Sequence, residues 1–120
     1  MSNPMYRVCV AGASGRMGQM LVDAVRHSGD CVLSGALDIA ASPAIGQDAG
    51  APSGQPTGVA ITADLATGLA GSQFLIDFTR PEGTLAHLQE CVKHGVNVVI
   101  GTTGFTEAQK AEIAEAAKRI

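Results

Sequence analysis

Tyr6–Gly18, with the sequence YRVCVAGASGRMG, is the stretch that decides the fold. Its first half, Tyr6–Ala11, is a short run of mostly apolar residues that is typical of a buried strand. Its second half, Gly12–Gly18, places a glycine at every third position and leads into an amphipathic pattern over residues 15–28. A strand, a glycine-rich turn and a helix in this order predict the start of a layered α/β fold.

The same alternation continues along the rest of the chain. The predicted strands cover residues 6–11, 31–37, 59–62, 73–78 and 97–100, and the predicted helices cover residues 15–28, 64–69, 79–95 and 106–120. Apolar strands that alternate with helices call for a parallel sheet covered on both faces. We therefore predict a Rossmann-like, doubly wound parallel sheet of the α/β class, with ligands at the carboxyl ends of its strands.

Local signals refine the element boundaries. The helix over residues 15–28 should end at the capping glycine Gly29. It should bury one face, formed by Met17, Leu21, Ala24 and Val25. Two capping boxes are predicted, Thr79 with Glu82 and Thr106 with Gln109, and Gly95 should end the helix that begins near residue 79. Residues 39–58 are rich in Ala, Ser, Pro and Gly and predict a long surface loop.

The glycine-rich turn has the context of a dinucleotide-binding fingerprint. It follows a strand, opens a helix, and is followed by an acidic residue, Asp38, 20 positions after Gly18 at the end of the second strand. Gly12 permits the tight turn, Gly15 leaves room for a pyrophosphate at the helix N-terminus, and Gly18 lets the helix pack closely. The Asp38 carboxylate is expected to accept hydrogen bonds from the adenosine ribose. The spacing is GxxGxxG, so one glycine stands a residue later than in GxGxxG.

Arg16 has two interpretations. It is either a solvated residue at the start of a helix, where a cation is slightly unfavourable, or a cation placed near a ribose 2′-phosphate.

Two further loops follow strands and precede helices, so they should line the same crevice edge. The first, residues 78–83, holds Thr79 as a helix N-cap and Arg80 as an exposed side chain. The second, Gly101–Gly104, offers backbone amides and the hydroxyls of Thr102 and Thr103, where a nicotinamide ring should arrive.

The remaining titratable residues near these loops have structural interpretations. The histidines all fall on predicted helices and are expected at surfaces or helix ends; they are His27, His87 and His94. Asp77 lies in an otherwise apolar strand, and its carboxylate either caps neighbouring loop amides or lies near a cofactor.

Composition excludes several functional classes. With 8 basic and 11 acidic residues the net charge is −3, and the basic residues form no run, so a nucleic-acid partner is not expected. No apolar stretch approaches the roughly 20 residues of a membrane span, and the first residues lack the apolar core of a secretory signal.

The cysteines indicate a reducing environment. Cys9, Cys31 and Cys91 are odd in number, lie in apolar segments and form no CxxC pair, so we expect buried free thiols and a cytoplasmic protein. The spacing offers no metal site.

Three runs of sequence closely resemble 4-hydroxy-tetrahydrodipicolinate reductase, the bacterial dihydrodipicolinate reductase family of lysine biosynthesis. They are VCVAGASGRMG at Val8–Gly18, IDFTRPEGTLAHL at Ile76–Leu88 and VIGTTGF at Val99–Phe105. The second and third runs, in that order, are far more specific than the glycine loop. The resemblance extends over essentially the entire chain.

The resemblance implies a cytoplasmic enzyme that reduces a cyclic dicarboxylate substrate to tetrahydrodipicolinate with NADH or NADPH. It also implies a set of cofactor-binding residues: Gly12, Ala13, Ser14, Gly15, Arg16 and Met17 at the pyrophosphate, Asp38 at the ribose, and Gly101, Thr102 and Thr103 near the nicotinamide. Some members carry Glu-Arg at the end of the second strand, where this chain has Asp38-Ile39. We therefore expect NADH to be preferred over NADPH.

The family's catalytic histidine and lysine, and most of its tetramer contacts, belong to a second domain. The sequence stops inside the last predicted helix, so we interpret residues 1–120 as an N-terminal dinucleotide-binding domain whose C-terminal substrate domain lies beyond it. No catalytic residue is assigned here. By itself the chain is expected to be inactive and monomeric, whereas the full-length enzyme is expected to be a homotetramer.

Two other classes share parts of this pattern. Another Rossmann-type amino-acid dehydrogenase would share the glycine loop but not both specific runs. A non-catalytic NAD(H)-sensing regulator should carry a DNA-reading helix-turn-helix, which the sequence does not show.

Overall fold

The computed structural model describes residues 5–120 and consists of one five-stranded parallel sheet flanked by helices. The strand order is β3-β2-β1-β4-β5. The strands are β1 (Tyr6–Ala11), β2 (Cys31–Leu37), β3 (Ile61–Thr62), β4 (Phe74–Asp77) and β5 (Asn97–Ile100). The third and fourth strands are shorter than the predicted residues 59–62 and 73–78.

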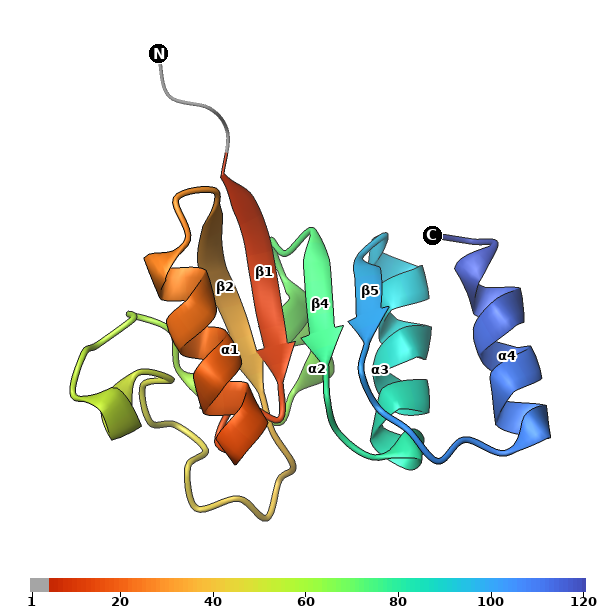
Figure 1. Ribbon diagram of the computed structural model, residues 1–120, viewed down its shortest axis with the longest axis horizontal. Coiled ribbons are helices and arrows are strands. Elements are labelled where there is room, and N and C mark those ends of the chain that lie inside the picture. Colours follow the sequence, from red (N-terminus) through yellow and green to blue (C-terminus); the bar gives the residue numbers. More distant parts are fainter. Residues whose placement is uncertain (1–4) are drawn as a thin grey trace.

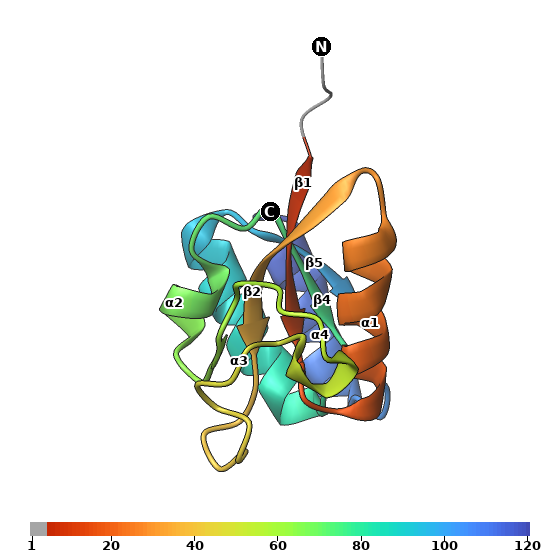
Figure 2. The ribbon, with the colours of Figure 1, turned by 90° about the vertical axis from the view of Figure 1, so that its left-hand side faces the viewer.

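The helices lie on both faces of this sheet. They are α1 (Arg16–His27), α2 (Leu65–Leu69), α3 (Pro81–His94) and α4 (Glu107–Ala117), with a short 3₁₀ helix at Ala51–Ser53. Figure 1 shows α1 in front of β1 and β2, with α2 and α3 behind the sheet, and Figure 2 shows the two layers from the side. Because β1 is central and the chain winds outward from it in both directions, the doubly wound prediction is confirmed.

The core has two layers, one on each face of the sheet. Cys9 and Leu75 pack toward α2 and α3, whereas Val10 and Ala36 pack toward α1 and Val22. Alternate residues of a central strand therefore serve opposite layers, which explains why β1 is apolar throughout its second half.

All three cysteines are free, but only two are fully buried. Cys9 and Cys91 have no exposed surface, and burial raises the pKa of each thiol to about 12. Cys31, at the start of β2, is only half-buried, so the expectation of three buried thiols is wrong at this position.

The buried stripe of α1 agrees with the predicted one at Leu21 and Val25 and differs at the other two positions. Gly18, Val22 and Val25 are buried, whereas Met17 is 44% exposed and Ala24 is also exposed. The stripe is centred on Val22 because this side chain lies over the sheet in the layer formed with Val10 and Ala36.

The end of α1 also differs from prediction. Ser28 ends the helix in an extended conformation, at φ −77° and ψ 135°, and Gly29 has no positive φ. An extended exit sends the chain directly toward β2, so no left-handed glycine is needed.

Of the other helix-end predictions, two are confirmed and two are wrong. Thr106 and Gln109 form the predicted capping box, and Gly95 ends α3 at φ 67°. The capping box at Thr79 and Glu82 is wrong: Arg80 is the N-cap of α3, because the Thr79 hydroxyl bonds Asp77 instead. The last helix ends at Ala117, before the final residue, with Lys118 as its C-cap.

Residues 39–58 form the predicted long surface loop, which internal hydrogen bonds hold in place. The Asp48 carboxylate accepts backbone hydrogen bonds from Gly50, Thr57 and Gly58, at 2.7 to 2.8 Å. These bonds, with those from Thr57 first, hold the pKa of Asp48 well below its usual range. Ala49 is inserted into the core layer beneath α1, which anchors the loop to the domain.

Residues 5–120 show neither a membrane-spanning helix nor a cluster of metal ligands. No helix in this range has the length and apolarity needed to cross a membrane. The same residues contain no group of three His, Cys, Asp or Glu side chains arranged to hold a metal ion.

Candidate functional site

The carboxyl ends of the parallel strands meet along one edge of the sheet, which is the lower edge in Figure 1. The glycine loop after β1, Asp38 after β2, the loop after β4 and the loop after β5 all lie there. The first two are joined directly, because the N–H groups of Gly12 and Ala13 both donate to the Leu37 carbonyl, at 2.8 and 3.0 Å. Such an edge is where open α/β sheets bind ligands.

Two glycines give the loop its shape. Gly12 has a φ of +76°, a left-handed conformation that side chains disfavour. At Gly18 a Cβ would lie 1.9 Å from the Gly12 carbonyl oxygen, so only glycine lets α1 approach its own loop this closely. The roles predicted for these two residues, a tight turn and close helix packing, are confirmed.

Most N–H groups of the loop are already used inside the domain. Gly12 and Ala13 bond Leu37, Ser14 bonds the Asp38 carboxylate at 2.9 Å, and Gly15 bonds the Gly12 carbonyl at 3.0 Å. The Ala13 side chain is buried and contributes to the core. These four residues therefore build the loop and leave the ligand-facing donors to the residues that follow.

The first turn of α1 provides those donors. Gly15, its N-cap, has no side chain to cap the helix, and the first turn holds no acidic residue. Within residues 5–120, the N–H groups of Arg16, Met17 and Gly18 have no hydrogen-bond partner. Unpaired N–H groups at the positive end of a 12-residue helix suit an anion. The Arg16 and Met17 side chains are exposed beside them.

Asp38 directly follows β2 and faces the glycine loop. Its Oδ2 accepts hydrogen bonds from both the N–H and the hydroxyl of Ser14, and its Oδ1 accepts from the N–H of Ile39 at 2.8 Å. The residue is half-buried, so part of the carboxylate surface is open to the crevice. The sequence predicted its place at the strand end but not its bonds to Ser14.

The loop after β5 is shaped by contacts with the loop after β4. A Cβ at Gly101 would lie 2.0 Å from Cε1 of Phe78, because the aromatic ring lies directly against this glycine. Thr102 is 9% exposed, and its hydroxyl is bonded inside the domain, whereas Thr103 is exposed. Only one of the two hydroxyls predicted to be available is therefore free to face a ligand.

A cavity of about 250 Å³ lies between the glycine loop, the end of β2 and α3. Its polar lining includes Asp38, Thr79 and His87, and Ile39 and Leu65 contribute apolar surface. The sequence predicted His87 to be a surface residue away from the strand ends, and this is wrong. Its side chain is only 14% exposed, and its Nδ1 lies 2.8 Å from Oδ2 of Asp77.

The Asp77 carboxylate bonds side chains and does not cap the loop amides, so the first of its two interpretations is wrong. It is fully buried and accepts hydrogen bonds from His87 and from the Thr79 hydroxyl at 2.6 Å. Burial alone would raise its pKa, but these bonds outweigh that effect and hold the pKa below its usual value. Arg80, as predicted, is exposed.

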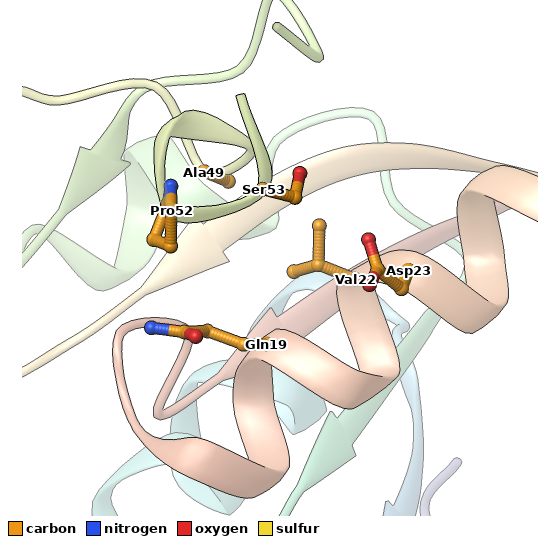
Figure 3. Close-up of a pocket in the computed structure, with 6 residues that line it drawn as sticks. All are labelled: Gln19, Val22, Asp23, Ala49, Pro52 and Ser53. Carbon is orange, nitrogen blue, oxygen red and sulfur yellow. The ribbon is translucent and has the colours of Figure 1, made fainter. Parts of the chain in front are cut away.

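A separate cavity of about 270 Å³ lies on the outer flank of α1, away from the strand ends. Figure 3 shows Gln19, Val22 and Asp23 of the helix opposite Pro52 and Ser53 of the 3₁₀ helix. The cavity lies where residues 39–58 pack onto α1, and its lining holds none of the candidate cofactor-binding residues.

Comparisons with solved structures support this description of the fold. A dipicolinate-bound dihydrodipicolinate reductase from Paenisporosarcina sp. TG-14 superposes with a TM-score of 0.71 and 27% identity, over 94% of this chain and 43% of that one. The WlbA dehydrogenase from Chromobacterium violaceum, solved with NADH and UDP-GlcNAcA, gives a TM-score of 0.75 at 22% identity, over 98% of this chain and 33% of that one. The second likeness shows a shared fold.

Sequence relatives are much closer. The 4-hydroxy-tetrahydrodipicolinate reductase of Herminiimonas arsenicoxydans is 62% identical over 113 residues, which are 94% of this chain and 42% of the relative. That of Cupriavidus taiwanensis is also 62% identical, over 94% of this chain and 43% of the relative. The chain thus spans less than half the length of these relatives. Residues 6–120 match the family described as "Dihydrodipicolinate reductase, N-terminus", and the chain belongs to this family.

Proposed function

We propose that the strand-end edge binds a nicotinamide dinucleotide, and that the chain is the cofactor-binding part of a 4-hydroxy-tetrahydrodipicolinate reductase. The observation that carries this proposal is the uncapped start of α1, where the N–H groups of Arg16 and Met17 lack partners beside an open glycine loop. An anionic pyrophosphate is the chemistry that such a helix start accepts. Family membership supports the same function.

The remaining candidate residues surround that point. Asp38 would bond the hydroxyls of the adenosine ribose, and Gly15 would leave the pyrophosphate free of side-chain contact. Gly101 and Thr103 would lie beside the nicotinamide through their backbone and hydroxyl groups, while Thr102 would support them from inside. The cofactor, when bound, supplies the hydride; the residues of this chain bind and orient it.

We further propose that NADH is preferred over NADPH. The Asp38 carboxylate would repel a ribose 2′-phosphate, and the next residue is the apolar Ile39. Arg16 is the competing influence, because its exposed side chain in the first turn of α1 could attract the same phosphate.

The relatives' greater length supports a division of labour between two parts of the full protein. In this proposal, residues beyond 120 bind the dicarboxylate substrate, supply the proton and form most of a homotetramer, and the full enzyme works in the cytoplasm. The chain alone would bind cofactor as a monomer and would not reduce substrate, because no positioned acid or carboxylate clamp would be present.

Calorimetric titration of this chain with NADH tests the proposal. Gly15→Val would place a branched side chain at the helix start, and we expect affinity to fall by about tenfold or more because a pyrophosphate needs close backbone approach there. Gly29→Val is the matched control, since a Cβ at Gly29 meets no atom within 4 Å and its φ is not positive. Unchanged affinity in Gly15→Val would refute binding at this loop, and turnover by the chain alone would refute the division of labour.

A further inference from the structure

The buried Asp77 carboxylate stands at the centre of a network that the cofactor-binding residues do not explain. Asp77 is the last residue of β4 and is completely buried. Its Oδ1 accepts the Thr79 hydroxyl at 2.6 Å and its Oδ2 lies 2.8 Å from His87 Nδ1. Both carboxylate oxygens are therefore engaged, by one residue of the following loop and one residue of α3.

Thr102 joins the same network to the loop after β5. Its Oγ1 accepts hydrogen bonds from the Thr79 N–H and from the Thr84 hydroxyl, both at 2.9 Å, and it donates to the Asp77 carbonyl at 3.4 Å. A hydroxyl has one donor and two acceptor sites, so Thr102 uses all of them. Thr84 is fully buried beneath it, in the first turns of α3.

The protonation state of the pair follows from these contacts. The low pKa of Asp77 means that its carboxylate is ionised near neutral pH, so His87 Nδ1 carries the proton and donates it. Within residues 5–120 the other ring nitrogen, Nε2, has no hydrogen-bond partner, and no polar side-chain atom of a partly buried residue is both buried and unpaired. Nε2 is therefore open to solvent, on a residue that lines the cavity beside Gly12 and Asp38.

Stability alone is a weak reason for this arrangement. Burying a charge costs free energy that hydrogen bonds only partly recover, and well-packed apolar residues often serve a core better. The charge is also placed where Thr79 is held against the glycine loop: a Cβ at Gly12 would lie 3.2 Å from the Thr79 methyl carbon. The bond to Asp77 fixes the Thr79 rotamer and hence the position of that methyl group.

We infer that Asp77 is a positioning residue of the cofactor site, which with His87, Thr79 and Thr102 locks the loops after β4 and β5 to each other. The inference rests on the proposed function, because the locked loops matter only if a dinucleotide lies across them. The network supports the loop at Gly101–Thr103 through hydrogen bonds to Thr102. It reaches the glycine loop only through the packing of Thr79 against Gly12, and within residues 5–120 no hydrogen bond joins it to the N–H donors of Arg16 and Met17. Disrupting it should therefore weaken binding of the nicotinamide half and spare the pyrophosphate.

The test compares NADH with ADP, which carries only the adenosine and pyrophosphate half, in calorimetric titrations of this chain. In Asp77→Asn we expect the Kd for NADH to rise about tenfold and the Kd for ADP to change by less than about threefold, as selective loss of one half-site requires. His87→Ala should have the same selective effect as Asp77→Asn, raising the Kd for NADH more than the Kd for ADP. His94→Ala is the matched control, because His94 lies on the same helix but bonds the Glu90 side chain away from the site.

Two conservative substitutions at Thr102 keep the test decisive if Asp77→Asn does not fold. Thr102→Val removes the hydroxyl that connects the loops while keeping the side-chain shape, and Thr102→Ser retains that hydroxyl. We expect Thr102→Val to weaken NADH selectively and Thr102→Ser to bind like the unaltered chain. Equal weakening of NADH and ADP, or no change in either, would overturn the positioning role. Absence of binding of both ligands to the unaltered chain would instead refute the proposed function itself.

Discussion

The Oδ2 atom of Asp38 accepts a hydrogen bond from the backbone N–H of Ser14 at 2.9 Å and a second one from the Ser14 hydroxyl. This contact joins the end of β2 to the middle of the glycine loop. The carboxylate proposed to bond the ribose therefore also holds the loop proposed to present the pyrophosphate. Removing the Asp38 side chain would disturb both, so its two roles must be separated by substitutions that change one property at a time.

Asp38→Asn removes the charge and keeps an oxygen that accepts from Ser14. Because a carboxylate beside a 2′-phosphate is a like-charge contact, we expect the ratio of NADPH to NADH affinity to rise by about tenfold in this variant. Parallel calorimetric titrations with the two cofactors measure the ratio. Ser14→Ala, which keeps the Asp38 charge, should leave the preference unchanged. A strong preference of the unaltered chain for NADPH that Arg16→Ala abolishes would show that Arg16 outweighs Asp38.

Gly18→Ala tests the close approach of α1 to its own loop. In an ordinary helix interior, replacing glycine with alanine stabilises by about 1 kcal/mol. Here the new Cβ would lie 1.9 Å from the Gly12 oxygen and 2.8 Å from the Ala13 Cα, so backbone must move. We expect a net destabilisation of about 1–3 kcal/mol, as for other overpacked sites. Urea unfolding measures it, and an increase in stability would contradict the described contact.

Thiol reactivity should separate the three cysteines. Burial raises the pKa of Cys9 and Cys91 to about 12, so at pH 8 neither carries appreciable thiolate in the folded chain. We expect a disulfide reagent to modify Cys31 alone under native conditions and all three residues in denaturant. Mass spectrometry of the labelled peptides identifies the sites. Rapid native labelling of Cys9 would contradict the described core.

The Asp48 carboxylate should make the stability of the loop over residues 39–58 pH-dependent. Its folded-state pKa is depressed, so its contribution is present above the unfolded pKa of about 3.9 and is lost as pH falls toward the folded value. We therefore expect backbone amides of residues 49–58 to lose hydrogen-exchange protection as the pH falls below about 4. In Asp48→Asn, protection should already be low at pH 6.

Asp30→Asn serves as the control for Asp48, because within residues 5–120 Asp30 makes its hydrogen bonds through its backbone alone. It should leave the pH profile of residues 49–58 unchanged. Equal protection in Asp48→Asn and the unaltered chain at pH 6 would show that the carboxylate does not order the loop.

Much of the fold could be predicted because its signals are local. Apolar β-branched runs mark the buried parallel strands, and Thr106 with Gln109 satisfies a capping box within a single turn. The turn at Gly12 is equally local, since its conformation depends on the absence of one side chain. Such features depend on neighbours in the sequence, so one sequence is enough to find them.

Two of the errors fall where a side chain bonds a group that its local sequence pattern does not indicate. Thr79 has the sequence of a helix cap, but Asp77 offers its hydroxyl a charged acceptor at 2.6 Å, and Arg80 becomes the N-cap. His87 was expected at a surface because helical periodicity does not say which side of α3 meets the end of β4. A histidine ten positions after a strand aspartate was the available signal, but only the packing of α3 on the sheet brings the two together.

The contact between Phe78 and Gly101 links two positions whose substitutions cannot be interpreted separately. With the aromatic ring in place, any side chain at position 101 would overlap it, since even a Cβ would lie 2.0 Å from the ring. A smaller residue at position 78 would remove that obstacle. A side chain at 101 therefore requires the Phe78 ring, which is 40% exposed, to turn away or to be smaller, so a non-glycine residue at 101 should accompany a repositioned or reduced side chain at 78 among related chains.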